Sequence, residues 1–215
     1  MKACGCKIIS SATTAAEAVW LAERGCDAII AQGYEAGGHR SIFLTDNTNN
    51  VASQAGTLAL VPQVVDAVKV PVIAAGGIAD ARGIVAAFAL GASAVQIGTA
   101  YLFTPEANVS AIHRKALAGA HDNSTALTNV FTGRPARGII NRMVREVGPI
   151  TSEAPAFPLA GGALAPLKAA AEAKGSGDFN ALWSGQAAAL AQEMPAKQLT
   201  ETLAREALAR MKRQS

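Results

Sequence analysis

One histidine, His39, stands where an α/β enzyme places a reacting group. It follows an apolar run, Ala28 to Ala31, whose length and two isoleucines predict a fully buried parallel strand. Gly37 and Gly38 directly precede it, and glycine lets the backbone approach a flat or anionic ligand because it has no Cβ. A strand, a Gly-rich loop and then an ionisable side chain predict a functional group at the carboxyl end of a sheet. The alternative is a plain turn with a surface histidine.

Two further predicted strands also end in glycine. The run 72–75 leads into Gly76-Gly77, and the run 94–97 leads into Gly98-Thr99. In (β/α)₈ barrels a phosphate commonly sits on the loops after the seventh and eighth strands, beside the amino end of a short helix. Backbone N–H groups and a helix dipole can hold a dianion there without a lysine. The two glycine-rich ends therefore predict a phosphate site.

Polar side chains accompany these strand ends. The Thr99 hydroxyl can join the phosphate site, and Gln32 and Gln96 are placed to meet the polar ring edges of a heterocycle. Glu35 is expected to be structural in its loop rather than a second base. Cys4, Cys6 and Cys26 lack the spacing of a zinc site, so we expect small buried hydrophobic residues and no metal.

The elements that position these groups alternate between strand and helix, which predicts parallel βαβ units. A first strand is expected at 7–10, followed by a helix that Thr14 caps, with Glu17 completing a capping box. The polar segment 40–54 has no periodicity and predicts a long loop. Later helices are expected near Leu60, with Pro62 in the first turn, and after an Asp80 cap.

The sequence changes character beyond Phe103. We expect helices over 109–117, 163–174, 181–193 and 197–212, a short extended piece at 127–131, and a helical face from Ile139 to Val144. The predicted division is 1–105, a partial barrel with its last four strands, and 106–215, a mostly helical extension packed on it. Half of the 215 residues are hydrophobic and 16% are charged, as in ordered helix-rich α/β proteins.

The chain is short for the barrel that its strand ends suggest. If the strands at 72–75 and 94–97 are the seventh and eighth, those at 28–31 and 7–10 are the sixth and fifth, and no sequence remains for four others. A complete barrel takes about 250 residues. We therefore expect an α/β fold that is the C-terminal half of a TIM (β/α)₈ barrel plus a helical extension. The alternative is a complete four-stranded open sheet.

The net charge and the hydropathy of the sequence limit the classes of partner that we expect. The net charge of +3 is too small to predict binding to nucleic acid or an anionic membrane. The sequence has no apolar run of membrane-spanning length, and strand-like sequence soon after Met1 gives no sign of a signal peptide. We expect a cytoplasmic protein that acts on a small molecule, with a homo-oligomer possible.

Several blocks closely resemble the nitronate monooxygenases, formerly called 2-nitropropane dioxygenases. The similarity extends from residue 1 to about residue 205 and is carried by the blocks 32–40, 71–80, 95–102, 131–141 and 182–186. The last two blocks point to this family rather than to FMN barrels in general. The resemblance implies an FMN-dependent TIM barrel that oxidises alkyl nitronates with O₂ to a carbonyl compound and nitrite. It also implies that the first strands and part of the flavin site lie outside this chain.

The resemblance assigns roles residue by residue. His39 matches the active-site histidine at the flavin edge, proposed to abstract the α-proton of a nitroalkane or to bind the anionic nitronate. Imidazole suits either role, since its ordinary pKa is about 6.5. Matches to flavin contacts are Gln32, Gly37 and Gly77, and the run Gln96, Ile97, Gly98 and Thr99. Two positions depart from the family: Ser41 replaces an expected glycine, and Phe157 stands where some relatives have a tyrosine facing the substrate.

Two other functions stay open at this point. One is an NAD(P)H-dependent FMN reductase on the same scaffold, acting on quinones or, as in FabK, on enoyl-ACP. The other is a catalytically inactive truncated product that binds FMN weakly at most. Among the remaining candidates, His113 and His121 are expected on the surface, Arg134 and Arg137 in packing or ion pairs, and Trp183 among the C-terminal helices.

Overall fold

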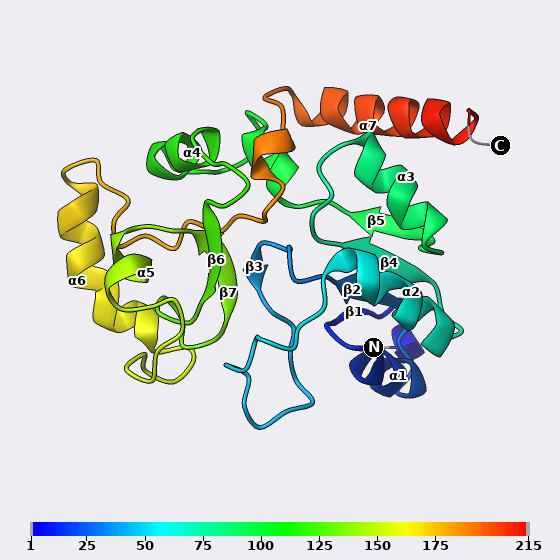
Figure 1. The fold of residues 1–215 in the computed structure, drawn as a ribbon, viewed down its shortest axis with the longest axis horizontal. Helices are drawn as coiled ribbons and strands as arrows, with labels where there is room; N and C mark the ends of the chain where they lie inside the picture. The colour runs from blue at the N-terminus through cyan, green and yellow to red at the C-terminus, as the bar shows by residue number, and fades with distance from the viewer. Residues whose placement is uncertain (1, 214–215) are drawn as a thin grey trace.

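The computed structural model describes residues 2–213 and contains two sheets (Figure 1). The first sheet is parallel, in the order β1-β2-β4-β5, and is linked by helices. Its strands are β1 (Ile9–Ala12), β2 (Ala28–Gln32), β4 (Val72–Ala75) and β5 (Ala94–Gln96), and its helices are α1 (Ala15–Glu23), α2 (Thr57–Ala67) and α3 (Ala81–Ala89). The predicted α/β fold with four parallel strands is confirmed.

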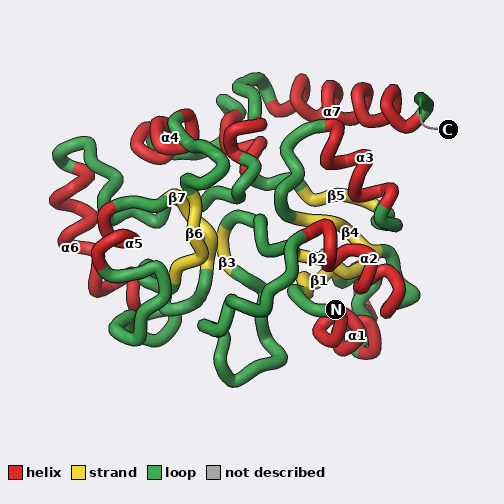
Figure 2. The backbone as a smooth tube through the Cα atoms, viewed as in Figure 1, coloured by secondary structure: helices red, strands yellow, loops and turns green. Residues whose placement is uncertain are grey.

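The second sheet is antiparallel, in the order β3-β7-β6, and lies beside the first (Figure 2). Its strands are β3 (Gly38–His39), β6 (Thr125–Thr128) and β7 (Ala136–Ile139). The remaining helices are α4 (Ala111–Ala118), α5 (Arg142–Glu146), α6 (Ala160–Glu172) and α7 (Ala196–Met211), with 3₁₀ turns at Lys2–Cys4, Thr99–Phe103 and Ala188–Leu190. Since β3 pairs with β7, this sheet joins the two halves of the predicted division at residue 105, which stays a prediction.

Several local predictions need correction. The C-terminal half contains strands β6 and β7, and the expected helical face from Ile139 starts instead as a strand followed by a short helix. The segment 181–193 is irregular apart from a 3₁₀ turn at Ala188–Leu190, because several of its residues line a cleft and Trp183 bridges to Gly138 instead of packing as a helix face. Pro62 lies inside α2, beyond its first turn, and the first strand begins two residues later than expected. Cys4 and Cys6 are exposed, whereas Cys26 is buried as expected.

The register of the parallel sheet aligns three residues at its carboxyl edge. Gln32 on β2 pairs with Ala75 on β4, which pairs in turn with Gln96 on β5. Residues in register on neighbouring strands point their side chains to the same face of a sheet. The two glutamines therefore flank an alanine on one face, at the end of the sheet from which the glycine-rich loops emerge.

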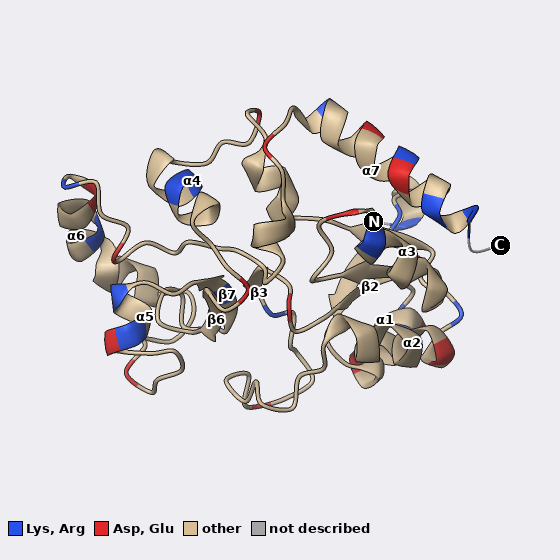
Figure 3. Ribbon diagram, turned by 45° about the horizontal axis from the view of Figure 1, so that its top comes forward, with Lys and Arg blue, Asp and Glu red and all other residues tan. Residues whose placement is uncertain are grey.

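The core of the parallel sheet lies between its strands and the surrounding helices. Ile29, Val61 and Val64 are fully buried there. Helix α7 also belongs to this core, because Leu199 and Leu203 pack with α3 residues. Both basic and acidic residues occur along α7, where they are most visible (Figure 3). No helix in the described part of the chain is long and apolar enough to cross a bilayer.

Glu17 is buried and ties the first strand to the loop that follows His39. Thr14 caps α1 as predicted, but the Glu17 carboxylate accepts hydrogen bonds from the Thr13 N–H and hydroxyl, each at 2.7 Å, instead of closing a capping box. Its other oxygen accepts from the N–H of Phe43 at 2.8 Å. The sequence predicted a local cap, whereas the carboxylate also holds a segment 26 residues away.

Replacing Glu17 by Gln should destabilise the fold. The amide keeps the size of the side chain but puts N–H donors against N–H groups that now have acceptors, and lost hydrogen bonds to a charged group cost about 1.5–3 kcal/mol. We expect urea unfolding to show a free energy of unfolding lower by about 2 kcal/mol. Glu23→Gln, at an exposed position of the same helix, should change it by less than about 0.5 kcal/mol. Equal effects of the two substitutions would contradict this role.

Candidate functional site

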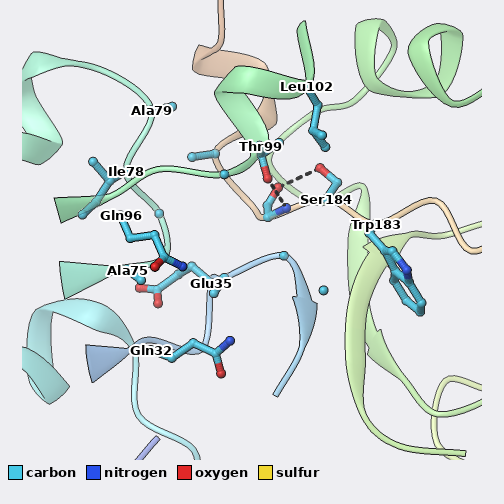
Figure 4. Close-up of a pocket in the computed structure, with 18 of the residues that line it drawn as sticks. Gln32, Glu35, Ala75, Ile78, Ala79, Gln96, Thr99, Leu102, Trp183 and Ser184 are labelled. Carbon is cyan, nitrogen blue, oxygen red and sulfur yellow. Dashed lines mark hydrogen bonds between the residues drawn. The ribbon is translucent and has the colours of Figure 1, made fainter. Parts of the chain in front are cut away.

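A cleft of about 250 Å³ opens at the carboxyl edge of the parallel sheet. Gln32, Glu35 and Gln96 lie on one side of it, and Thr99, Ser184 and Trp183 lie on the other (Figure 4). The glycine loops after β2, β4 and β5 all line it. The three strand ends that the sequence singled out therefore meet in one space.

Gln32 lines this cleft, but its amide is used within the protein. Its Nε2 donates to the carbonyl oxygen of His39 at 2.9 Å, and its Oε1 accepts from the N–H of Ser41 at 2.9 Å. The side chain thus bridges the backbone on both sides of residue 40. One N–H of the amide remains for a ligand, since an amide nitrogen donates twice.

The His39 side chain lies at the junction of the two sheets. Its Nε2 is 2.9 Å from the Thr132 hydroxyl, and its ring centroid is 5.5 Å from that of Trp183 and 5.9 Å from that of Phe157. Trp183 is shared with the cleft, which places the imidazole beside the cleft rather than inside its wall. Neither Thr132 nor Trp183 was predicted from the sequence to contact His39.

The surroundings of His39 favour its neutral form. Partial burial lowers the pKa of the imidazole below its usual 6.5, and the positive charge of Arg134 lowers it further. Arg134 donates to the carbonyl oxygen of Ile42, and its guanidinium lies 5.8 Å from the ring of Phe157. At pH 7 the ring is therefore predominantly neutral and able to accept a proton.

Some glycines at and near the cleft are required by the packing of the protein, whereas another borders open space. A Cβ on Gly37 would lie 2.5 Å from the Gly185 nitrogen, and a Cβ on Gly33 would lie 1.9 Å from the Thr57 Oγ1, so packing alone requires glycine at both positions. A Cβ on Gly98 would meet nothing within 4 Å. Gly77 has φ +69°, a conformation that favours glycine whatever the space around it.

Donors for an anion remain at the ends of β4 and β5. The backbone N–H groups of Gly77 and Gly98 lie outside helices and strands and have no hydrogen-bond partner among residues 2–213. The Thr99 hydroxyl oxygen accepts from the Gly185 N–H at 2.8 Å, which leaves its own proton for a ligand. Free N–H groups beside a space that a Cβ could fill fit the predicted phosphate position.

Other candidates lie differently from what the sequence suggested. The Ile97 side chain does not line the cleft; it packs with the parallel-sheet core and faces the groove beneath α7. His113 is half-buried, not surface-exposed, and its Nε2 lies 2.9 Å from the carbonyl oxygen of Trp183. Arg137 is buried and donates to the carbonyl oxygen of Tyr34 at 3.0 Å. His121 is exposed, as expected.

Glu35 has the structural role predicted for it. Its carboxylate accepts from the Thr57 N–H at 2.8 Å and from the Thr57 hydroxyl at 2.9 Å. Because the N-cap residue of α2 is Gly56, which has no side chain, Glu35 supplies the missing cap from a distant loop. Among the described residues, no group of three or more His, Cys, Asp or Glu side chains could hold a metal ion.

Fold and cleft together define a class: a barrel-type α/β protein with a cleft at the carboxyl ends of its parallel strands, where such folds bind their ligands. The nitronate monooxygenase family model matches residues 1–206, so the chain belongs to the nitronate monooxygenase family. A nitronate monooxygenase from Pseudomonas aeruginosa is 45% identical over 207 residues, and a probable nitronate monooxygenase from Staphylococcus saprophyticus is 41% identical over 201. These alignments cover 96% and 94% of this chain.

Solved structures give the same result. A nitroalkane oxidase from Streptomyces ansochromogenes superposes with a TM-score of 0.91 and 40% identity, covering 100% of this chain and 61% of its own. FabK from Thermotoga maritima superposes with a TM-score of 0.79 and 33% identity, covering 97% and 63%. The chain spans 58% and 56% of the length of the two curated relatives. The resemblance to the family is thus confirmed, as is an α/β fold with four parallel strands that matches part of a larger family structure.

Alanine substitutions should separate the two kinds of glycine. Gly37→Ala forces a Cβ against the backbone of residues 184–185, and overpacking of this kind costs about 1–3 kcal/mol. Gly98→Ala meets open space and should leave the free energy of unfolding unchanged or raise it by up to about 1 kcal/mol. Denaturant unfolding of the two variants measures this difference. A Gly98→Ala variant as unstable as Gly37→Ala would contradict the open cleft.

Proposed function

We propose that this chain forms the flavin-side part of an FMN-dependent enzyme that oxidises alkyl nitronates with O₂ to a carbonyl compound and nitrite. The observation that carries the proposal is a hydrogen-bonded, neutral imidazole beside a cleft that three glycine-rich strand ends line. Family membership supports the reaction, and the nitroalkane oxidase superposition supports the substrate class. In this proposal His39 is the catalytic residue, and the substrates are a small nitronate or nitroalkane and O₂.

The cleft suits FMN in several respects. The free N–H groups of Gly77 and Gly98, with the hydroxyl of Thr99, form a place for the phosphate. Gln96 and the remaining N–H of Gln32 face the same space and can bond the polar edge of a heterocycle. Gly37 and the backbone of Ile97 complete the proposed contacts. The isoalloxazine, when bound, supplies the redox chemistry, and these residues orient it.

The pKa of His39 favours one of its two proposed roles. A neutral imidazole can take the α-proton of a nitroalkane, whereas binding the nitronate anion by charge would need the imidazolium. Burial and Arg134 both lower the pKa and so hold the ring in the neutral form. We therefore assign His39 as the base that converts a neutral nitroalkane to the nitronate. Phe157 and Trp183 give the ring an apolar surround in which an alkyl group can pack.

An NAD(P)H-dependent FMN reductase is the second candidate. The FabK superposition, with 33% identity over nearly the whole chain, favours it. Both functions would use the same cleft, and they differ in the source of electrons. Location in the cytoplasm, a homo-oligomer and the two-part division of the chain stay predictions from the sequence.

FMN should bind weakly to the 215-residue chain alone. The cleft of about 250 Å³ is smaller than the roughly 300–1,000 Å³ typical of ligand pockets, so part of the flavin would remain exposed. We expect fluorescence titration to give saturable binding without stoichiometric retention on gel filtration. Gly98→Ala should weaken binding at least tenfold, because its methyl group occupies the phosphate position, while exposed Gly162→Ala should not. Purification as a yellow protein with full flavin content would contradict the prediction of weak binding.

Activity can be tested in a chimera in which this chain replaces the 207 aligned residues of the Pseudomonas aeruginosa relative. We expect nitrite from alkyl nitronates and from nitroalkanes. His39→Gln should lower the rate with neutral nitroalkanes by about 10²–10⁴-fold, as loss of a general base does, and affect preformed nitronates less. The nitroalkane rate should rise as pH increases through the pKa of His39, which is lowered from its usual 6.5, and level off at higher pH, since only the neutral ring accepts a proton.

His121→Gln, at an exposed site, is the matched control and should keep full activity. Equal loss on both substrates would instead assign His39 to binding the anion. Rapid flavin reduction by NADPH without nitrite formation would reject nitronate oxidation in favour of the reductase.

A further inference from the structure

The hydroxyl of Thr132 has three polar neighbours but only one proton to share among them. Its oxygen lies 2.9 Å from the Nε2 of His39, 3.2 Å from the carbonyl oxygen of Arg134 and 3.4 Å from the N–H of Arg134. The carbonyl can only accept and the backbone N–H can only donate. The ring nitrogen can do either, depending on the tautomer.

One arrangement of protons satisfies every contact. If the Thr132 hydroxyl donates to the Arg134 carbonyl, its oxygen accepts from the Arg134 N–H and from a proton on His39 Nε2. If the hydroxyl donates to Nε2 instead, the Arg134 carbonyl loses the side-chain donor it has in the first arrangement. The hydrogen bond at one ring nitrogen sets the tautomer of a histidine. In the first arrangement Nε2 therefore carries the proton, and Nδ1 carries the lone pair that can accept another.

We propose that Thr132 is a positioning residue that holds the proton of His39 on Nε2 and leaves Nδ1 as the proton-accepting atom. Nδ1 has no hydrogen-bond partner among the described residues, so it is free for a substrate. The rings of Trp183 and Phe157 restrict the orientation of the imidazole without offering a strong acceptor. The use of Nδ1 as a base rests on the proposed function, whereas the tautomer is a property of this chain.

The charged groups near the ring do not compete for this role. Arg134 acts on His39 through its charge, while its guanidinium is directed to the carbonyl oxygen of Ile42. Arg137, on β7 opposite β3, bonds the carbonyl oxygen of Tyr34 and the hydroxyl of Thr125. Both are donors only, so neither can accept the Nε2 proton.

Long-range ¹H–¹⁵N NMR of the ¹⁵N-labelled 215-residue chain at pH 8 reads the tautomer directly. The chain has three histidines, and His39 is assigned by the signals that disappear in His39→Gln. We expect His39 Nε2 to resonate as the protonated ring nitrogen and Nδ1 as the unprotonated one. His113 is an internal reference for this pattern, because its Nε2 faces a carbonyl oxygen and must donate. Exposed His121 should show averaged nitrogens.

Two substitutions at Thr132 test whether its hydroxyl sets the tautomer of His39. Thr132→Val keeps the shape but removes the acceptor, so the His39 nitrogens should move toward the averaged pattern and its titration midpoint should shift to lower pH. Thr132→Ser keeps the hydroxyl and should restore the wild-type pattern. The signals of His113 should stay unchanged in both variants and thereby report an intact fold.

A wild-type His39 with its proton on Nδ1, or with both nitrogens averaged, would overturn the proposal even if Thr132→Val failed to fold. A His39 signal unaffected by Thr132→Val would overturn it as well. Neither outcome depends on flavin or nitronate. If the NMR pattern is as expected but the chimera forms no nitrite, the proposed function is rejected and the assigned tautomer is not.

Discussion

Two side chains, of Arg40 and Gln32, hold the backbone around His39 at the end of β2, because each bonds backbone groups of the segment that carries the other. The Arg40 guanidinium, which is buried, donates to the carbonyl oxygens of Gln32 and Gly33 and to the side chain of Gln54. The Gln32 side chain in turn bonds the backbone of residues 39 and 41. Burial lowers the pKa of Arg40 to about 10, so the guanidinium stays charged at neutral pH. Hydrogen bonds to the end of β2, in the parallel sheet, therefore fix the position of His39, although its own strand, β3, belongs to the antiparallel sheet.

Much of the parallel sheet could be predicted from the sequence because its signals are local. Apolar runs ending in glycine place β2 and β4, and the caps at Thr14 and Asp80 form as expected. For the antiparallel sheet the sequence predicted only a short extended piece at 127–131, which overlaps the end of β6. Every residue of β7 is buried, including Arg137, so it lacks the alternation that indicates a strand. The partners of His39 at 132, 157 and 183 are distant in sequence, and only the assembled fold reveals them.

The glycines of the cleft are a second case in which the sequence alone does not reveal why a residue is needed. From sequence alone, Gly37 and Gly98 both read as positions where the backbone meets a ligand. In the structure, Gly37 is required by the backbone of residues 184–185, which lies in the space its Cβ would need, while Gly98 borders open space. A residue can thus line a site because of protein packing or because of a ligand. The atoms that an added Cβ would meet distinguish the two cases, whereas the residue type does not.

The surroundings of His39 at the junction of the two sheets favour the neutral base proposed for this position. The wall formed by the parallel strand ends is polar, with free backbone N–H groups, whereas the side that faces His39 carries aromatic rings and Arg134. Partial burial and the positive charge of Arg134 both lower the pKa of the imidazole and so favour its neutral form. If His39 acts as the proposed base, the developing nitronate is anionic, and the Arg134 charge that lowers the pKa of His39 would also stabilise that product. The proposed removal of a proton from a neutral carbon acid therefore suits this electrostatic arrangement better than charge pairing by His39 itself.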